Sequence, residues 1–137
     1  MSFTTPCFIR KNTLELRKKL EELGYTNVPN GRGEWFIPIE ELKYLITYPE
    51  SGYYQGCNGY WYKDDFNCGT NEELFLALAA LRDDTDKNQW FINDNHIWYN
   101  CKYNKFREEI ADWTSTIISC PWHKATVEEI IEHFKDR

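Results

Sequence analysis

The sequence predicts an α+β protein with small, mostly antiparallel sheets and packed helices. Two observations lead to this prediction. A helix-start signal occurs three times along the chain, and short runs rich in aromatic and β-branched residues lie between these starts. Because the starts are almost evenly spaced, we also expect an approximate internal duplication of a unit built from a strand, a capped helix and a second strand.

Three short segments share the pattern Asn/Thr-x-x-Glu-Leu/Ile, which is typical of a capping box. In this motif the first side chain accepts a hydrogen bond from the third helical amide, and the Glu returns a bond to the amide of the cap. The segments are 12–16, 70–74 and 126–130. Each of them predicts the start of a helix.

Behind these caps the apolar residues recur at i, i+4 and i+7, so each helix should bury one face. The expected inward residues are Leu16, Leu20, Leu23, Leu74, Leu78, Leu81, Ile130 and Phe134. Gly24 should end the first helix in a left-handed conformation. The Asp83-Asp84 pair should mark the end of the second helix.

The three caps are separated by 58 and 56 residues, and the run Trp-Phe-Ile follows the first two caps at 35–37 and 90–92. Each of these runs reads as a strand that returns from its helix. We expect one domain over the whole chain. Its predicted parts are repeat units at about 6–66 and 67–115 and a final strand and helix at 116–137.

The segments between these landmarks are less distinctive. Residues 38–48 fit a helix that begins at Pro38, and they fit a strand equally well. Residues 59–66 should be extended, and residues 96–103 should form a strand after an Asn-Asp-Asn turn. Residues 105–114 have the apolar spacing of a further helix.

Aromatic residues make up 17% of the 137 residues, with six Trp, nine Tyr and eight Phe. One core of this size cannot enclose every indole and phenol and also satisfy their polar atoms, so several should lie at the surface. Exposed Trp and Tyr are frequent anchors for ligands and partner proteins. We therefore expect a binding surface, and a homodimer is one use that such a surface could have.

The formal net charge is −6, and residues 69–137 carry eight Lys and Arg against thirteen Asp and Glu. Binding to a nucleic acid polymer needs a basic face, so this class of partner is disfavoured. No segment has the character of a membrane span or a secretory signal, and the five cysteines lack disulfide-framework spacing. These features predict a cytoplasmic protein with reduced thiols and no membrane partner.

Metal chemistry has weak support. Cys120 and His123 have the spacing of two zinc ligands and His133 offers a third, but a structural zinc site needs four. Residues 84–95 begin like a calcium loop and then lack its required Gly and Glu. We expect no metal and no cofactor; instead, Cys120 should end a strand and His123 should lie in a loop.

Catalytic motifs are missing from the sequence, including the nucleophile elbow, the phosphate-binding loop, the dinucleotide fingerprint and the zinc-protease helix. Cys68 lies two residues before the second cap, where a helix N-terminus can activate a thiol. A buried cysteine beside a strand explains this position better. We therefore expect a protein that is not an enzyme.

Two groups of residues are candidates for ligand binding. Cations beside free amides at the first helix start can bind an anion, and a glycine-rich turn adds a further Arg, although a solvated hairpin turn also explains that loop. The candidate anion-binding residues are Arg10, Lys11, Asn12, Thr13 and Arg32. Aromatic residues on predicted strands are candidates for stacking, although alternation should turn about half of them inward. The stacking candidates are Trp35, Tyr60, Trp61, Tyr62 and Trp98.

Three segments carry a resemblance to known sequences: CFIRKNT at 7–13, GTNEELFLALAALRDD at 69–84 and KATVEEIIEHFK at 124–135. They resemble small uncharacterised proteins carried by phages and mobile elements of gut anaerobes. The resemblance covers the three capped helices and implies no fold, activity or site residues. It implies a setting in which short accessory proteins block a host defence component or sequester its nucleotide signals.

Together these observations predict a non-catalytic binding protein, with counter-defence as the implied setting. In the first version the ligand is a small anionic aromatic molecule such as a signalling nucleotide, since local charge outweighs total charge for a small ligand. In the alternative, the protein inhibits a host defence protein through an acidic, aromatic-rich face. The residues expected on that face are Asp83, Asp84 and Asp86.

Overall fold

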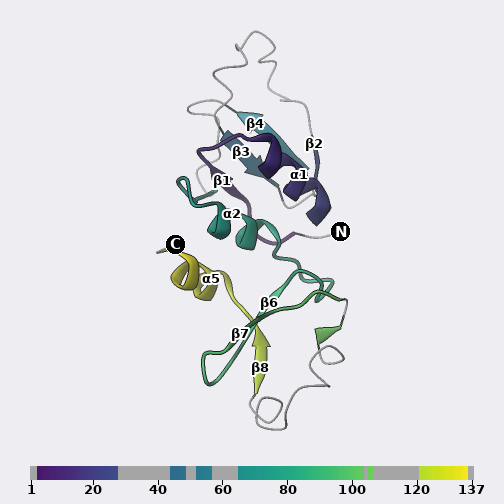
Figure 1. Ribbon diagram of the computed structural model, residues 1–137, viewed down its shortest axis with the longest axis vertical. Helices are drawn as coiled ribbons and strands as arrows, with labels where there is room; N and C mark the ends of the chain where they lie inside the picture. The colour runs from purple at the N-terminus through teal and green to yellow at the C-terminus, as the bar shows by residue number, and fades with distance from the viewer. Residues whose placement is uncertain are drawn as a thin grey trace.

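The computed structural model describes residues 3–27, 44–48, 52–56, 65–103, 105–106 and 121–135. Within these residues the chain forms three helices and two sheets, mostly antiparallel, which confirms the predicted α+β class. Figure 1 shows the two sheets at opposite ends of an elongated molecule, with two of the helices between them. The helices between the two sheets therefore occupy the middle of the protein.

The larger sheet has five strands in the order β2-β4-β3-β1-β5. The strands are β1 (Cys7–Ile9), β2 (Thr26–Asn27), β3 (Tyr44–Thr47), β4 (Gly52–Gly56) and β5 (Phe66–Asn67). β3 pairs antiparallel with both β1 and β4. The two outer pairs are parallel: β5 pairs with β1, and β2 pairs with β4. Of the segment 38–48, which fits a helix or a strand, the described part is a strand.

The central strands of this sheet are buried on both faces. Cys7, Ile9 and Leu45 belong to the main core, whereas Phe8 and Ile46 belong to a second cluster on the opposite face. Strands that are covered on both sides lose the alternation of apolar and polar residues. This explains why the period-2 pattern of β3 does not stand out in the sequence.

The three helices are α1 (Leu14–Leu23), α2 (Glu72–Ala79) and α5 (Val127–Phe134). Their predicted apolar faces are buried or half-buried, although Leu81 lies beyond the end of α2, which is shorter than expected. Gly24 ends α1 with a φ of 113°, in the left-handed region where a residue without Cβ is favoured. The predicted end of the first helix is therefore confirmed.

Two of the helices begin one residue later than the capping-box pattern predicts. The cap of α1 is Thr13, rather than Asn12, and the cap of α2 is Asn71. The residue that would return the hydrogen bond is then a leucine in both helices, and a leucine side chain has no acceptor. α5 does begin with the predicted box, because Thr126 and Glu129 exchange hydrogen bonds between side chain and backbone.

The smaller sheet is antiparallel and has the strand order β7-β6-β8. Its strands are β6 (Trp90–Asn93), β7 (Trp98–Asn100) and β8 (Trp122–Lys124). β7 lies within the predicted strand 96–103, and β6 extends the predicted run 90–92 by one residue. β8 corrects the prediction for His123, which was expected in a loop but pairs opposite Ile92 of β6.

The predicted turn between β6 and β7 is confirmed. The Oδ1 atom of Asn93 accepts hydrogen bonds from the amides of Asn95 and Ile97, both at 2.9 Å. The amide of His96 donates to the Asn93 carbonyl, and His96 takes a positive φ of 60°. The Asn93 side chain thus replaces backbone groups as the acceptor inside the turn.

The topology does not confirm the internal duplication. α1 leads from β1 back into the same sheet through β2, whereas α2 leads from β5 in the larger sheet to β6 in the smaller one. A single core cluster includes side chains from both sheets and all three helices, among them Ile9, Leu20, Leu78, Ile92 and Ile130. α2 and α5 therefore connect the two sheets through one continuous core.

Several predicted segments lie outside the described residues, among them 35–37, 59–64 and 107–114. Phe106, which directly precedes the last of these, is buried and stacks on Phe91 with ring centroids 3.9 Å apart. In the part of the chain that the structure describes, no helix combines the length and the apolar character needed to cross a bilayer.

Candidate functional site

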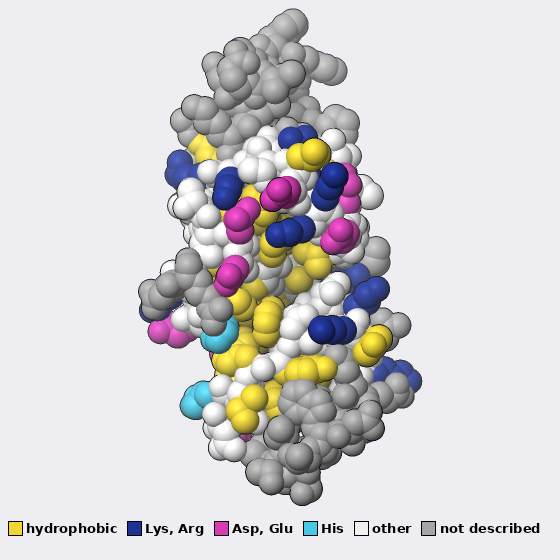
Figure 2. All heavy atoms as spheres, viewed as in Figure 1, with side chains coloured by type: hydrophobic (Ala, Val, Ile, Leu, Met, Phe, Trp, Pro, Cys, Tyr) yellow, Lys and Arg dark blue, Asp and Glu magenta, His cyan; other side chains and the backbone are white. Residues whose placement is uncertain are grey.

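A groove of about 670 Å³ lies between α1, α2, α5 and the smaller sheet. This volume is in the range of cavities that bind small molecules. Figure 2 shows an apolar band across the middle of the molecule, with Lys, Arg, Asp and Glu side chains above it. The apolar lining of the groove is Leu23, Leu76, Ala77, Ala80, Trp90 and Phe134. Its polar lining is Lys19, Glu22, Glu73, Lys87, Asn88 and Asn100.

Trp90 is the largest side chain of the groove, and it is half-buried. Its ring meets Phe134 and Trp98 edge-on, with centroid distances of 5.4 and 6.3 Å. Among the described residues none of its ring contacts is a parallel stack. The edge contacts fix the orientation of the indole, so a planar ligand in the groove would supply the stacked partner.

Two lysines from different elements reach the groove. Lys19 extends from α1, and Lys87 extends from the loop between α2 and β6. Neither ammonium group forms an ion pair with any residue that the structure describes. Glu22 and Glu73 line the same groove, so the formal charges balance. The two ammonium groups can donate to a phosphate or carboxylate without first breaking an internal pair.

Two carboxamides add hydrogen-bonding groups to the groove. Asn100, at the end of β7, donates from Nδ2 to the backbone carbonyl of Asn88 at 3.4 Å. Asn88 has a φ of 66°, and its amide donates to the Cys101 carbonyl at 2.8 Å. Asparagine is one of the few residues that adopt this left-handed conformation readily. The end of the loop is thereby fastened to β7.

Gln89 fixes the loop that carries Lys87. The Gln89 residue is 1% exposed, and its Nε2 donates to the Ala80 carbonyl at 2.6 Å and the Lys87 carbonyl at 3.1 Å. Its Oε1 accepts from the Arg82 amide at 3.0 Å. A buried amide that is hydrogen-bonded on both its nitrogen and its oxygen is a rigid link. It ties the end of α2 to the start of β6 and so positions the side of the groove formed by the loop.

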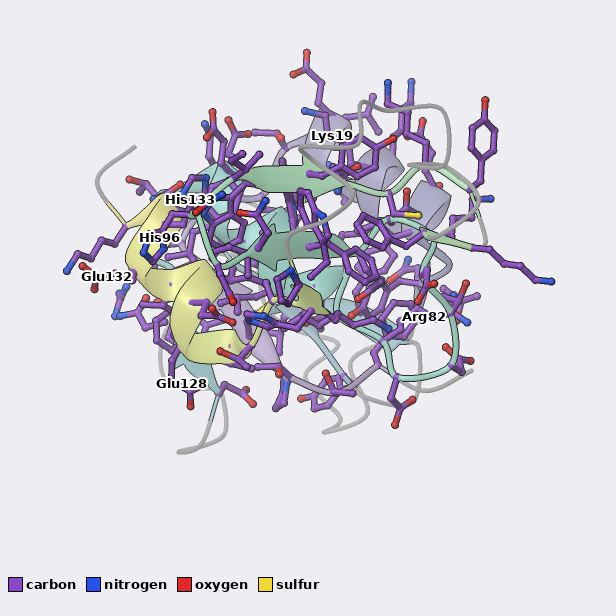
Figure 3. All side chains as sticks on the ribbon, turned by 90° about the horizontal axis from the view of Figure 1, so that it is seen from below. Lys19, Arg82, His96, Glu128, Glu132 and His133 are labelled. Carbon is purple, nitrogen blue, oxygen red and sulfur yellow. The ribbon has the colours of Figure 1, made fainter. Side chains whose placement is uncertain are left out.

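A second cavity, of about 370 Å³, lies beside α5. His96 from the β6–β7 turn and His133 from α5 both line it, and Figure 3 labels both on the side of the molecule where α5 lies. The His133 ring stacks on Trp98, with centroids 4.1 Å apart and 15° between the ring planes. Trp98 also lines this cavity, which makes its wall aromatic. The acidic lining consists of Glu128, Glu129 and Glu132.

The third histidine of the chain, His123, contacts the start of α5. Its Nε2 lies 2.9 Å from Oε1 of Glu129. Partial burial of Glu129 favours the neutral acid, but hydrogen bonds from the Thr126 backbone and from His123 favour the carboxylate and lower the pKa of Glu129. Across the described ranges, no group of three His, Cys, Asp or Glu side chains has the arrangement to hold a metal ion. Cys120, the remaining zinc candidate, lies outside those ranges.

The residues predicted to bind an anion at the first helix start make internal contacts. Lys11 Nζ lies 3.3 Å from a carboxylate oxygen of Glu72, and Thr13 caps α1 through its side chain. The guanidinium of Arg10 lies 5.7 Å from the centroid of the Tyr44 ring. Neither of the two cavities is lined by any predicted residue of this helix start. The structure therefore does not join these cations to a stacking residue.

Of the predicted stacking residues, the structure describes Trp98 alone. Trp98 lies between the two cavities, where it contacts His133 and Trp90. The other candidate ligand-binding residues outside the described ranges are Arg32, Trp35, Tyr60, Trp61 and Tyr62.

The acidic residues predicted to bind a partner protein belong to the loop after α2. The carboxylate of Asp84 accepts two hydrogen bonds from the Arg82 guanidinium, both at 2.9 Å. Asp86 lies 3.7 Å from Lys124 Nζ, which also donates to two carbonyls of the loop, whereas Asp83 is exposed. Cations of the chain itself thus compensate the negative charge that follows the helix.

Cys68 is buried, as its structural interpretation predicts. A hydrogen bond with Cys7, together with burial, raises the pKa of the Cys68 thiol. Because the thiolate is the nucleophilic form, a raised pKa makes this cysteine unreactive at neutral pH.

Comparison with protein-family models, with curated proteins and with solved structures returns no match. The geometry of the groove is therefore the basis for a functional conclusion. Sequence reasoning did not identify its polar residues Lys19, Lys87, Asn88 and Asn100, and it placed Trp90 only in a strand. One signal in the sequence could have identified part of the groove. The segments 90–92 and 96–103 are predicted as neighbouring strands, and their pairing in the correct register sets Asn100 opposite Trp90.

Proposed function

We propose that this is a non-catalytic binding protein that sequesters a small anionic aromatic ligand, such as a signalling nucleotide, in the groove. The proposal rests on one combination of features: the half-buried ring of Trp90 and two ammonium groups, Lys19 and Lys87, that have no ion-pair partner among the described residues. An aromatic ring gains stacking on the indole, and a phosphate gains charge-assisted hydrogen bonds from the lysines.

The charges of the groove limit the size of the anion. Lys19 and Lys87 can pair with one or two negative charges of a ligand, whereas Glu22 and Glu73 line the same space and would repel a long polyanion. The net charge of −6 also disfavours a nucleic acid polymer. A small nucleotide fits both conditions.

Counter-defence is part of the proposal, and it rests on the resemblance to phage and mobile-element proteins. A binding protein without turnover acts by lowering the free concentration of its ligand. The protein must then be present in excess over that ligand in the host cell.

The alternative function, inhibition of a host defence protein through an acidic face, has weaker support. Asp84 and Asp86 are engaged with Arg82 and Lys124, so a partner would have to compete with contacts that stabilise the loop. Asp83 and the 69% exposed Tyr103 remain accessible to such a partner.

Thermal unfolding in the presence of nucleotides tests the proposal. The panel should include mononucleotides, cyclic mononucleotides and cyclic dinucleotides. A ligand at 100 times its Kd should stabilise the folded protein by about 2.7 kcal/mol. If no member of the panel raises the Tm, the proposed ligand class is wrong.

Charge variants connect any such binding to the groove. Lys19→Gln and Lys87→Gln should each weaken binding of the best nucleotide, because each removes one cationic donor. Lys18→Gln is the matched control, since Lys18 is the exposed neighbour of Lys19 on α1 and does not line the groove. Equal affinity of all three variants, measured by calorimetry, would place the ligand elsewhere.

A further inference from the structure

The groove holds an aromatic platform and a hydrogen-bonding edge in a fixed relation. Trp90 and Asn100 are paired directly opposite each other in the β6–β7 register, and both line the groove. Directly paired residues of antiparallel strands point to the same face of the sheet, with Cβ atoms about 4.5–5.5 Å apart. A ring that stacks on Trp90 therefore presents its edge to the carboxamide of Asn100.

The orientation of this carboxamide follows from its neighbour. Asn100 Nδ2 lies 3.4 Å from the backbone carbonyl oxygen of Asn88, and that oxygen can only accept. A flipped carboxamide would place Oδ1 against the same oxygen, so two acceptors would face each other. The amide of Asn88 itself donates to the Cys101 carbonyl, so the Asn88 carbonyl is held in place next to Asn100.

The locked carboxamide leaves two groups for a ligand. Among the described residues, Oδ1 of Asn100 has no hydrogen-bond donor, and the second N–H of Nδ2 has no acceptor. An acceptor beside a donor is the pattern by which asparagine binds the N6 amino group and N7 of adenine. At this edge hypoxanthine and guanine carry an oxygen at position 6, which would face Oδ1 and repel it.

We propose that Asn100 binds the N6/N7 edge of a purine that stacks on Trp90, and that it thereby makes the groove selective for purines with an amino group at position 6. This inference rests on the proposed function, because it specifies the ligand of the same groove. Asn100 is thus a specificity-determining residue, and the carbonyl of Asn88 fixes the orientation of its carboxamide.

Two pairs of nucleotides that differ only at position 6 provide the test. Binding of 5′-AMP and 5′-IMP, and of 3′,5′-cyclic AMP and cyclic IMP, is measured by calorimetry. A correct bidentate pair should favour the 6-amino member by roughly 5- to 100-fold. In the variant Asn100→Leu this ratio should fall to about 1, because leucine has similar size and no polar group. Asn27→Leu, an exposed strand position outside the groove, should keep the ratio of the unmodified protein.

Asn100→Ala is a second variant, for use if the leucine substitution disturbs folding as judged by circular dichroism. It removes the acceptor and both donors without adding bulk, so the preference should again be lost. Equal binding of the 6-amino and 6-oxo members, or a preference that survives both substitutions, would overturn the selectivity while the proposed function stands. Binding of a different panel nucleotide with no binding of any 6-aminopurine would also overturn it. If no nucleotide binds at all, the proposed function fails as well.

Discussion

Gln89 should be among the most sensitive positions of the protein, although it touches no proposed ligand. Gln89→Met keeps a similar volume and removes three hydrogen bonds. The hydrogen bond to the Ala80 carbonyl is buried, and breaking it should cost about 1–3 kcal/mol. The bonds to the Arg82 amide and the Lys87 carbonyl are part-buried, and breaking each should cost about 1 kcal/mol. The free energy of unfolding should therefore fall by about 3–5 kcal/mol.

Urea unfolding followed by far-ultraviolet circular dichroism measures this change, with the m-value as a check on two-state behaviour. Lys87→Met is the matched control: it adds the same side chain at an exposed position and should change stability by about 0.5 kcal/mol or less. Gln89→Glu gives an independent signature. Its carboxylate would face two carbonyls at neutral pH, so this variant should regain stability on acidification, when the acid can donate. A loss below about 1 kcal/mol for Gln89→Met would refute the role assigned to the network.

Two further predictions concern the helix starts and alkaline pH. Asn71→Ala should lower the free energy of unfolding by about 1–2 kcal/mol, because Asn71 caps α2 and also donates to the Phe134 carbonyl. The control Thr70→Ala should lower it by about 0.5 kcal/mol or less. If urea unfolding shows the larger loss for Thr70→Ala, Thr70 is the cap. Burial raises the pKa of the Tyr25 phenol and helps to raise that of the Cys68 thiol, so both stay neutral in the folded state after they ionise in the unfolded chain. The contribution of these two groups to the free energy of unfolding should thus be fully present below about pH 8.5. Above that pH it should fall by up to about 1.4 kcal/mol per pH unit for each group. A free energy of unfolding that is constant from pH 8 to about 11 would contradict this assignment.

Local signals in the sequence were sufficient to find the three helices and the start of α5, but not the first residues of α1 and α2. Asn12 and Thr13, like Thr70 and Asn71, are adjacent residues that can both act as caps. The position of Glu favours the first residue of each pair, and the structure uses the second. For α2 a tertiary contact favours this choice, because Nδ2 of Asn71 donates to the carbonyl of Phe134 in α5. No local pattern contains that contact.

The groove was not predictable from residue types. Lys18 and Lys19 are neighbours of the same kind on the same helix, yet only Lys19 lines the groove. The difference depends on how α1 faces the loop that carries Lys87, and that arrangement arises from contacts between distant segments. Likewise, Asn100 becomes relevant only through the register that sets it opposite Trp90. Such pairings follow from the sequence through folding, but they cannot be recognised from residue types and local spacing.

The cations predicted to bind an anion at the first helix start lie close to another helix start. The starts of α1 and α2 lie side by side, since the Arg10 amide donates to the Gly69 carbonyl at 2.7 Å. Acidic residues in a first turn favour a helix start, and Glu72 occupies such a position in α2. Its carboxylate therefore pairs with Lys11 of the neighbouring start. When two helix starts are adjacent, an acidic residue that stabilises one can therefore pair with a cation of the other, whereas Lys19 and Lys87 lie on different elements across the groove and form no such pair with a described residue.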